Sequence, residues 1–279
     1  MTSISNITNI ALMYDFDKTL STKDMQEYDF IPSLSMTPTQ FWTASDQFAK
    51  QHKMDHILST MYLMIDKAKR GNINLSQESL REQGKQIELF PGVLDWFERI
   101  TNYGLTLGLN VRHYIISSGL KTMIEGTPIA KYFTQIFASD FLYDQQGFPV
   151  WPSMAINFTS KTQFLYRIHK GVEDTAEHIK LNRKQDKNEV QVPFSNMIYF
   201  GDGFTDVPSM KLTRLNGGYS VGVYQNQDNN YLVADDRVSF YVPADYREGS
   251  LLDKTIKAII NRMSADAELA KLGWDKLVD

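Results

Sequence analysis

The sequence predicts an α/β fold, in which a parallel sheet is covered by helices on both faces and a helical segment is inserted near the start. Short apolar runs predict buried strands at Ile10–Tyr14, Tyr114–Ser117, Met197–Phe200 and Val221–Tyr224, and Phe240–Val242 is a fifth candidate. Helical patterns lie at Val93–Asn102, Ser160–Lys170, Asp206–Leu215 and Leu251–Met263. Strands that alternate with helices in this way are typical of a parallel sheet between two helical layers.

Residues from about 22 to 90 break the alternation, because they contain no clear strand beyond their first few positions. Their strongest helical pattern spaces apolar side chains at three- and four-residue intervals: Met54, Ile57, Leu58, Met61, Met64, Ile65 and Ala68. Such a stripe indicates the core of a small helical bundle rather than a cofactor site. Pro91-Gly92 marks the return to the α/β core. We therefore expect a core of residues 1–21 and 91–279, with 22–90 inserted.

Two further segments are predicted to lie at the periphery. Phe141–Trp151 has the pattern of a hairpin that turns at Asp144–Gly147 and decorates an edge of the sheet. Val172–Val192 is polar and charged, which indicates an exposed surface segment.

Composition narrows the class of partner. The 279 residues are 42% hydrophobic and 22% charged, with a net charge of -4 and no long basic run, so neither nucleic acid nor an anionic membrane is an expected partner. A small molecule fits better. The absence of cysteine excludes disulfides, thiolate catalysis and cysteine-bound zinc.

The first residues carry no signal for secretion. No basic segment precedes the apolar run Ile10–Tyr14, and Asp15 interrupts that run at once, so it is neither a signal peptide nor a membrane span. We expect a cytoplasmic protein.

Two carboxylates follow the first predicted strand. Asp15 and Asp17 stand two residues apart at its carboxyl end, the edge at which open α/β sheets bind ligands. A calcium loop fails on spacing, because its sixth position would be Leu20 instead of glycine and its twelfth Gln26 instead of glutamate. A lone Asp-x-Asp triplet also arises by chance, so a second element is needed.

That second element is Gly201-Asp202-Gly203-Phe204-Thr205-Asp206, where the strand Met197–Phe200 runs into an acidic turn that opens a helix. Asp202 taken alone would fit a turn residue and Asp206 a helix cap. Four carboxylates at strand ends, however, repel one another unless a cation lies among them. Hard oxygen ligands favour magnesium, Mg²⁺.

With these motifs the chain resembles the haloacid dehalogenase superfamily, and within it the phosphoserine phosphatase-like group with a helical cap. Four motifs carry the resemblance in order: DFDKTL at residues 15–20, YIISSG with Ser117, Lys161 opening the helix SKTQFLYRI, and GDGFTD at 201–206. The resemblance implies a Rossmann-like core with a mainly helical cap domain, here residues 22–90.

The resemblance also implies the roles of the site residues. Asp15 would attack phosphorus, and Asp17 would act as general acid and then as general base. The Asp15 carboxylate, the Asp17 carbonyl, Asp202 and Asp206 would hold Mg²⁺. Ser117, Ser118, Gly119 and Lys161 would contact the phosphoryl group, whose transfer depends on positioning and electrostatics.

The cap would select the substrate, a small phosphorylated metabolite. Asp24 falls near an acidic residue that phosphoserine phosphatases use, and Gln83 falls where their cap arginine grips the serine carboxylate, with Arg81 close by. Two alternatives to a phosphatase stay open: a phosphomutase or phosphotransferase of the same superfamily, and a non-catalytic module that binds Mg²⁺ or phosphate. The oligomeric state stays undetermined.

Overall fold

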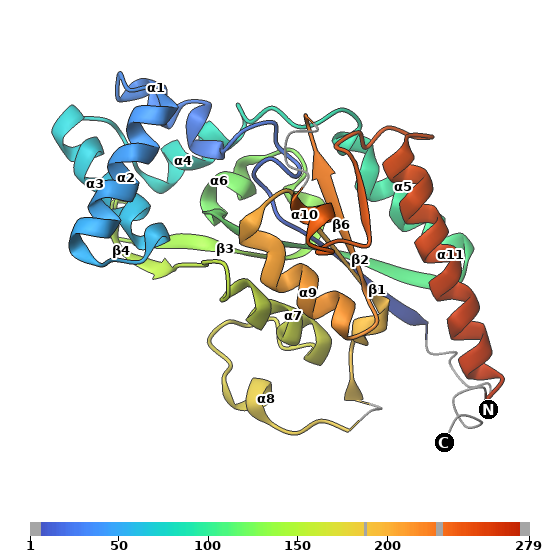
Figure 1. Ribbon diagram of the computed structural model, residues 1–279. Helices are drawn as coiled ribbons and strands as arrows, with labels where there is room; N and C mark the ends of the chain where they lie inside the picture. Colours follow the sequence, from blue (N-terminus) through green and yellow to red (C-terminus); the bar gives the residue numbers. More distant parts are fainter. Residues whose placement is uncertain (1–6, 187–188, 227–230, 274–279) are drawn as a thin grey trace.

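A twisted sheet forms the centre of the computed structural model, which describes residues 7–186, 189–226 and 231–273 (Figure 1). Within these residues the strand order is β4-β3-β2-β1-β5-β6-β7. The strands are β1 Thr8–Tyr14, β2 Leu109–Leu120, β3 Phe133–Tyr143, β4 Pro149–Met154, β5 Met197–Gly201, β6 Tyr219–Tyr224 and β7 Phe240–Pro243. All neighbours pair in parallel except β3 and β4. The predicted α/β fold is confirmed.

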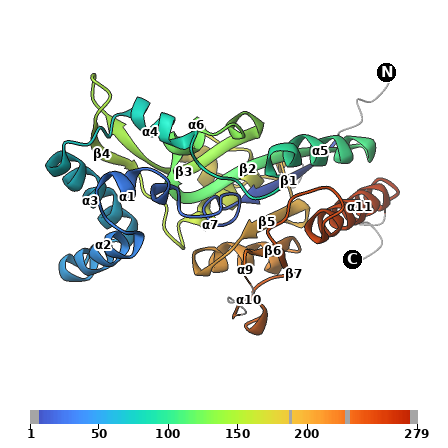
Figure 2. The ribbon, with the colours of Figure 1, turned by 90° about the horizontal axis from the view of Figure 1, so that it is seen from above.

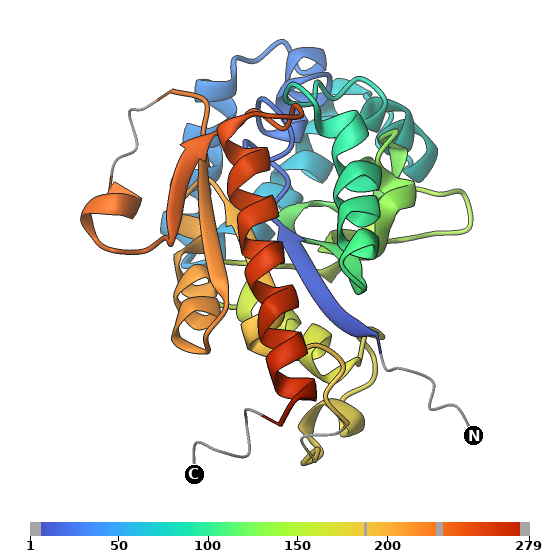
Figure 3. The ribbon, with the colours of Figure 1, turned by 90° about the vertical axis from the view of Figure 1, so that its right-hand side faces the viewer.

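Helices cover both faces of the sheet. α5 (Val93–Thr106) and α11 (Leu251–Lys271) lie over one face, and α7 (Lys161–Lys170) and α9 (Val207–Leu215) over the other (Figures 2 and 3). Side chains along β1 alternate between the two faces of the sheet. Ile10 and Leu12 pack in the core on the α5–α11 side, whereas Ala11 and Met13 pack in the core on the α7–α9 side. A strand that is buried on both faces is apolar throughout, and this continuous apolar run is what predicted β1 from the sequence.

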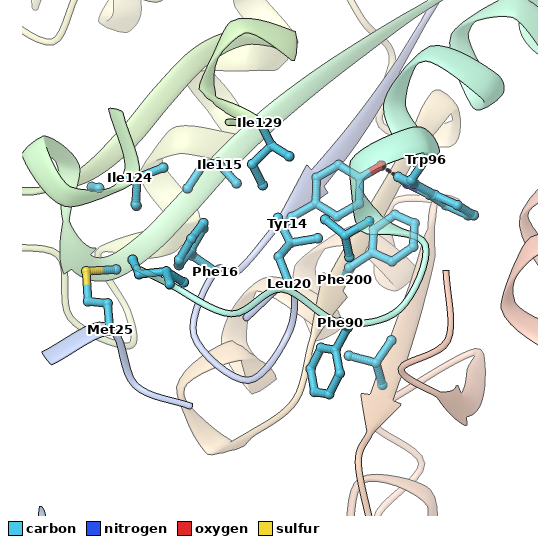
Figure 4. Packing of buried hydrophobic residues seen from close by; sticks show 14 of the residues in the cluster. Tyr14, Phe16, Leu20, Met25, Phe90, Trp96, Ile115, Ile124, Ile129 and Phe200 are labelled. Atoms are coloured by element: carbon cyan, nitrogen blue, oxygen red, sulfur yellow. Dashed lines mark hydrogen bonds between the residues drawn. The ribbon is translucent and has the colours of Figure 1, made fainter. Parts of the chain in front are cut away.

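The core on the α5–α11 side is rich in aromatic rings (Figure 4). Tyr14 stacks on Phe200, with ring centroids 4.5 Å apart, and its hydroxyl accepts a hydrogen bond of 2.9 Å from Trp96 Nε1. The same hydroxyl lies 3.1 Å from Nδ1 of His113, which is also buried. The polar groups of Tyr14, Trp96 and His113 are therefore paired inside this core.

The predicted hairpin is present at the edge of the sheet. β3 and β4 pair antiparallel, and Gly147 N donates to the Asp144 carbonyl in the turn. The sequence did not indicate the part of β3 before Phe141 or the short α6 (Lys121–Gly126) that follows β2. It also placed the end of the last helix at Met263, whereas α11 continues to Lys271.

Residues between 22 and 90 are helical, as expected. They form α1 (Phe30–Ser33), α2 (Pro38–His52), α3 (His56–Gly71), α4 (Gln77–Gly84) and a 3-10 turn, Met25–Glu27. Thr37 and Asp55 cap the amino ends of α2 and α3 with their side chains. The chain enters and leaves this segment side by side, because Phe90 N donates to the Leu20 carbonyl and Ser21 pairs with Leu89.

This helical segment rests on the β3–β4 side of the core. α4 packs against α6, and α3 contacts β4. Two hydrogen bonds tie the parts together: Gln77 N to the Gly147 carbonyl, 2.8 Å, and Asn157 Nδ2 to Asp55 Oδ2, 2.9 Å. The docking positions α3 over the carboxyl ends of the central strands.

Most of the predicted surface segment after α7 is exposed, although residues 187–188 within it lie outside the described part of the chain. The buried Arg167 holds its beginning, because its guanidinium donates to the carbonyls of Val172, Asp174, Thr175 and Glu177. The short helices α8 (Ile179–Asn182) and α10 (Tyr231–Ala234) and the 3-10 turns Ala130–Tyr132, Phe194–Asn196 and Phe204–Asp206 complete the described elements. None of the helices in the described ranges has the length and apolar character that crossing a membrane requires.

Candidate active site

Three neighbouring strands end at one place on the sheet. β1 lies between β2 and β5, and Asp15 N donates to the carbonyl of Phe200 at 2.9 Å. This hydrogen bond holds the DFDKTL motif after β1 beside the GDGFTD motif after β5. Strand order reverses at β1, so the crevice above it is the topological switch point at which α/β sheets bind ligands. The sequence motifs on these strands are thereby brought together.

Asp15, Asp202 and Asp206 form a compact carboxylate cluster. One oxygen from each lies within 4.8 Å of the others. Burial, opposed in part by Lys161, raises the pKa of Asp15 to about 6, and burial together with Asp206 and Asp15 raises the pKa of Asp202 well above its usual value. Crowded carboxylates of this kind fit a hard divalent cation, because a cation would replace their mutual repulsion with attraction.

Asp206 is saturated by donors from the protein. Its Oδ1 accepts from Lys161 Nζ and from the Tyr199 hydroxyl, each at 2.8 Å. Its Oδ2 accepts from the backbone N–H groups of Asp202 and Gly203, at 3.2 and 3.3 Å. Four donors on two oxygens indicate that Asp206 positions its neighbours. Gly201 is required here, since a Cβ atom would lie 2.4 Å from this carboxyl group.

Lys161 is the buried cation of the site. Its ammonium group lies 2.8 Å from Asp206 Oδ1 and 3.0 Å from Asp15 Oδ1, and its side chain is fully buried. Burial lowers the pKa of Lys161, but the carboxylates of Asp15 and Asp206 raise it more, so the group stays charged. The first residue of α7 therefore carries a fixed positive charge against Asp15.

Asp17 is placed for proton transfer. Burial, with the nearby carboxylates of Asp24 and Asp15, raises the pKa of Asp17 well above its usual value. Its Oδ1 accepts a hydrogen bond of 2.8 Å from Met25 N, which fixes the side chain. A raised pKa favours the protonated form, which suits a carboxyl group to act as a general acid.

The end of β2 supplies small polar groups. Gly119 N donates to Ser117 Oγ at 3.0 Å, and the buried Ser118 hydroxyl has no hydrogen-bond partner among the described residues. A Cβ atom on Gly119 would lie 2.8 Å from Asp17 Oδ2 and closer still to the end of the Met25 side chain, so a larger residue would displace both side chains. An unpartnered buried hydroxyl at this position is available to an incoming ligand.

Two adjoining cavities open at this edge. The smaller, of about 180 Å³, is lined by Asp15, Asp17, Lys18, Asp24, Ser117, Ser118, Asp202, Gly203, Phe204 and Thr205. The larger, of about 340 Å³, is lined by Asp17, Lys18, Asp24, Gln26, Trp42, His56, Ile57, Thr60, Met61, Met64, Ser118, Gly119 and Leu120. They share Asp17, Lys18, Asp24 and Ser118, so one ligand can extend from one into the other.

Of the predicted cap residues, Asp24 lines the cavities, whereas Arg81 and Gln83 do not. Asp24 lines both cavities and forms an ion pair with Lys18. Arg81 and Gln83 are not among the residues that line either cavity: Arg81 pairs with Glu125 at 3.2 Å, and Gln83 is buried on α4 with its Oε1 unpartnered. α4 faces α6 rather than the cavities, which places both residues away from the carboxylate cluster.

Several lining residues were not singled out from the sequence as site residues. Gln26, His56 and Thr60 gave no motif signal. Ile57, Met61 and Met64 belong to the stripe that predicts a helical core, and they also line the larger cavity. The other stripe residues lie on α3, whereas Met54 precedes that helix. Periodicity alone also does not distinguish a helix face that packs from one that borders a cavity.

No family model matches the sequence. The chain is similar to an uncharacterized protein of Borreliella burgdorferi, strain ATCC 35210 / DSM 4680 / CIP 102532 / B31. The two are 28% identical over 275 residues, which cover 87% of this chain and 93% of that protein.

Solved structures resemble the fold over most of the chain. A phosphoserine phosphatase in the form of a phospho-aspartyl intermediate analogue matches 90% of this chain and 99% of its own, with a TM-score of 0.57 and 12% identity. A substrate-bound phosphoserine phosphatase matches 86% and 96%, with a TM-score of 0.57 and 13% identity. A HAD family hydrolase from Salmonella enterica serovar Typhi matches 83% and 66%, with a TM-score of 0.58 and 18% identity. The chain thus has the fold of haloacid dehalogenase-type hydrolases and phosphoserine phosphatases, as the resemblance implied.

Proposed function

We propose that the protein is a Mg²⁺-dependent phosphatase that hydrolyses a small phosphorylated metabolite through an aspartyl phosphate on Asp15. The observation that carries this proposal is the contact of the buried Lys161 ammonium group with Asp15, 3.0 Å, at the floor of a carboxylate cluster that opens into two joined cavities. A fixed cation beside a carboxylate nucleophile suits attack on a phosphate dianion, which would otherwise repel it.

The first step is transfer of the phosphoryl group to Asp15. An Asp15 carboxylate oxygen attacks phosphorus, the bond from phosphorus to the ester oxygen breaks, and Asp17 gives its proton to that oxygen. The raised pKa of Asp17 keeps this proton available, and the hydrogen bond from Met25 N holds the carboxyl group in place. The alcohol then leaves by way of the larger cavity.

The second step is hydrolysis of the acyl phosphate. Asp17, now a carboxylate, takes a proton from a water molecule, whose oxygen attacks phosphorus and releases Asp15 and inorganic phosphate. Lys161 and the unpartnered Ser118 hydroxyl, together with Ser117 and Gly119, stabilise the phosphoryl oxygens in both steps. Asp206 keeps Lys161 aimed at Asp15 through its contact of 2.8 Å.

Asp15, Asp202 and the backbone carbonyl of Asp17 would hold Mg²⁺, with Asp206 supporting them from the adjacent position. When bound, the ion would act as a Lewis acid that draws charge from the phosphoryl oxygens. The oxygen-only donor set fits this ion rather than a soft metal. We further propose that residues 22–90 act as the cap, because α3 and the 3-10 turn at Met25 form one wall of the larger cavity.

The assay is release of inorganic phosphate from an aryl phosphate such as 4-nitrophenyl phosphate, with Mg²⁺ and with chelator. Rapid quenching and mass spectrometry should find the phosphoryl group on Asp15. A phosphotransferase or phosphomutase would form the same intermediate but pass the group to an added alcohol in preference to water. A non-catalytic module would bind Mg²⁺ and phosphate and show neither intermediate nor turnover, which would refute the proposal.

A further inference from the structure

The polar side chains that line the larger cavity are almost all satisfied within the protein. Lys18 pairs with Asp24, and His56 pairs with Asp46. Thr60 Oγ1 binds Ser45 Oγ at 2.8 Å, and Trp42 Nε1 donates to Glu27 at 2.8 Å. Among the described lining residues, these pairings leave few groups available to recognise a ligand.

Gln26 is an exception among the polar residues that line the larger cavity. Its side chain is 6% exposed, lines the larger cavity and has no hydrogen-bond partner in the described part of the chain. The amide atoms of Gln26 are not sealed from solvent, so they are open to the cavity and can bind an incoming polar group in place of water. Ser118 is likewise unpartnered, but it lines both cavities and so faces the phosphoryl group.

Charge in the larger cavity is neutralised. In the part of the chain that the structure describes, its lining contains no arginine, and the basic side chains of Lys18 and His56 each have an acidic partner. Asp24 is in turn occupied by Lys18. Among the described lining residues, a leaving group with a free carboxylate would therefore find no basic side chain without an acidic partner, and one with a free ammonium group would find Asp24 already paired with Lys18.

The remaining walls are apolar: Trp42, Ile57, Met61, Met64 and Leu120. The volume of about 340 Å³ has room for roughly ten non-hydrogen atoms, since a water molecule occupies about 30 Å³ of liquid. Ligand sites of this kind bind an apolar surface and use a few polar groups to fix orientation. Resting on the function proposed above, we propose that the substrate is the phosphate ester of an uncharged alcohol, and that the Gln26 amide binds a second hydroxyl or a carbonyl oxygen on that alcohol.

Sugars and substituted phenols share this chemistry, so the test has an arm for each. Wild type with Mg²⁺ is assayed on hexose 6-phosphate and on phenyl phosphates that carry either a hydroxymethyl or a methyl group at the same ring position. The ratio of kcat/KM for the hydroxymethyl ester to that for the methyl ester reports the hydrogen bond alone. We expect wild type to favour the hydroxymethyl ester, and Gln26→Leu to lower the ratio about tenfold, the effect of one hydrogen bond to a buried amide.

Gln83→Leu is the matched comparison, because Gln83 is also a glutamine with 6% exposure but lies outside both cavities. It should keep the wild-type ratio. Gln26→Glu is a second variant in case Gln26→Leu does not fold: its added negative charge should raise relative activity on ethanolamine phosphate. An unchanged ratio in folded Gln26→Leu, or a changed ratio in Gln83→Leu alone, would overturn the proposal while leaving phosphatase activity established.

A binding measurement separates the two proposals. Isothermal titration of benzyl alcohol, 1,4-benzenedimethanol and glucose into wild type and into Gln26→Leu requires no turnover. One outcome is that no ester is hydrolysed, yet 1,4-benzenedimethanol or glucose binds about tenfold more weakly to Gln26→Leu than to wild type. The phosphatase proposal then fails and the recognition role of Gln26 stands. Absence of both binding and hydrolysis would refute both.

Discussion

Tyr199 donates its phenolic hydrogen to Oδ1 of Asp206 at 2.8 Å, the same oxygen that binds Lys161 Nζ. Both residues are fully buried, Tyr199 within β5 and Asp206 at the start of α9. The tyrosine thus fixes a carboxylate that itself fixes the site's cation. Tyr199, inside the sheet, is in this way linked to Asp15 through Asp206 and Lys161.

Replacing Tyr199 with phenylalanine should weaken catalysis without removing any group that contacts substrate. A hydrogen bond to a charged acceptor contributes about 1.5–3 kcal/mol. If about half of this free energy serves to hold the Lys161 ammonium group against Asp15, Tyr199→Phe should lower kcat about tenfold. Tyr114→Phe is the matched control, because Tyr114 is also buried on a central strand but bonds to Glu173. Equal activity in the two variants would show that the contact is structural only.

The role of Tyr199 illustrates what the sequence did not indicate. Within the apolar run Met197–Phe200, a tyrosine has the pattern of a core residue, and its partner depends on how the strand meets the turn at Asp206. The carboxylates themselves were predictable because each stands just after a buried strand, and parallel strands end at one edge. Lys161 was predictable only through the family resemblance.

The walls of the larger cavity depend on contacts between distant segments. Gln26 and α3 reach the site because α4 packs on α6 and Asp55 bonds to Asn157, pairings that no local pattern encodes. The start of β3 was missed for a similar reason, since Phe133–Ile136 is only half-buried and lacks a continuous apolar run. Local propensity predicts elements well, but docking requires the whole fold.

Metal removal should abolish activity. Without a cation, the carboxylates of Asp15, Asp202 and Asp206 repel an incoming phosphate. Phosphate release should cease in EDTA and return with Mg²⁺. Binding should also stabilise the fold, by about 2.7 kcal/mol at a hundredfold excess over Kd, and Asp202→Asn should reduce this gain. Full turnover after thorough chelation would contradict the prediction.

The two aspartates of the first motif should fail in different ways. Asp15→Asn should abolish phosphorylation of the protein, because the amide is not a competent nucleophile. Asp17→Asn keeps the nucleophile but cannot donate or accept the proton, so both formation and breakdown of the acyl phosphate should slow. Single-turnover quench measurements distinguish the two variants. Wild-type turnover by Asp15→Asn protein, checked by mass spectrometry for deamidation, would refute the mechanism.

L-phosphoserine should not be the preferred substrate. Selection of its carboxylate calls for a cation, which arginine supplies through two parallel hydrogen bonds. No arginine is among the described residues that line the larger cavity, and Arg81 is paired with Glu125 outside it. A comparison of kcat/KM across sugar, nucleotide, aminoalcohol, aryl and serine phosphates tests this. Phosphoserine leading that panel by tenfold would show that the cap closes differently around its substrate.

His113 should make the fold sensitive to acid. Burial lowers the pKa of His113 from 6.5 to about 3, in a pocket where its two nitrogens lie 3.1 Å from the Tyr14 hydroxyl and 3.0 Å from Thr101 Oγ1. Between those two pKa values the unfolded chain binds a proton that the folded chain does not. The free energy of unfolding therefore falls as pH drops below about 6.5, by up to roughly 1.4 kcal/mol per pH unit.

The raised pKa values of Asp15, Asp17 and Asp202 act in the opposite direction, since the folded chain then holds protons that the unfolded chain has released. The difference between variants isolates His113. From pH 7 to pH 5, wild type should lose about 2 kcal/mol more than His113→Gln, measured by urea denaturation in chelator. His169→Gln is the control, because His169 is only partly buried and lies on α7. If His113→Gln and wild type lost stability in parallel over this range, the buried imidazole would not be the group that titrates.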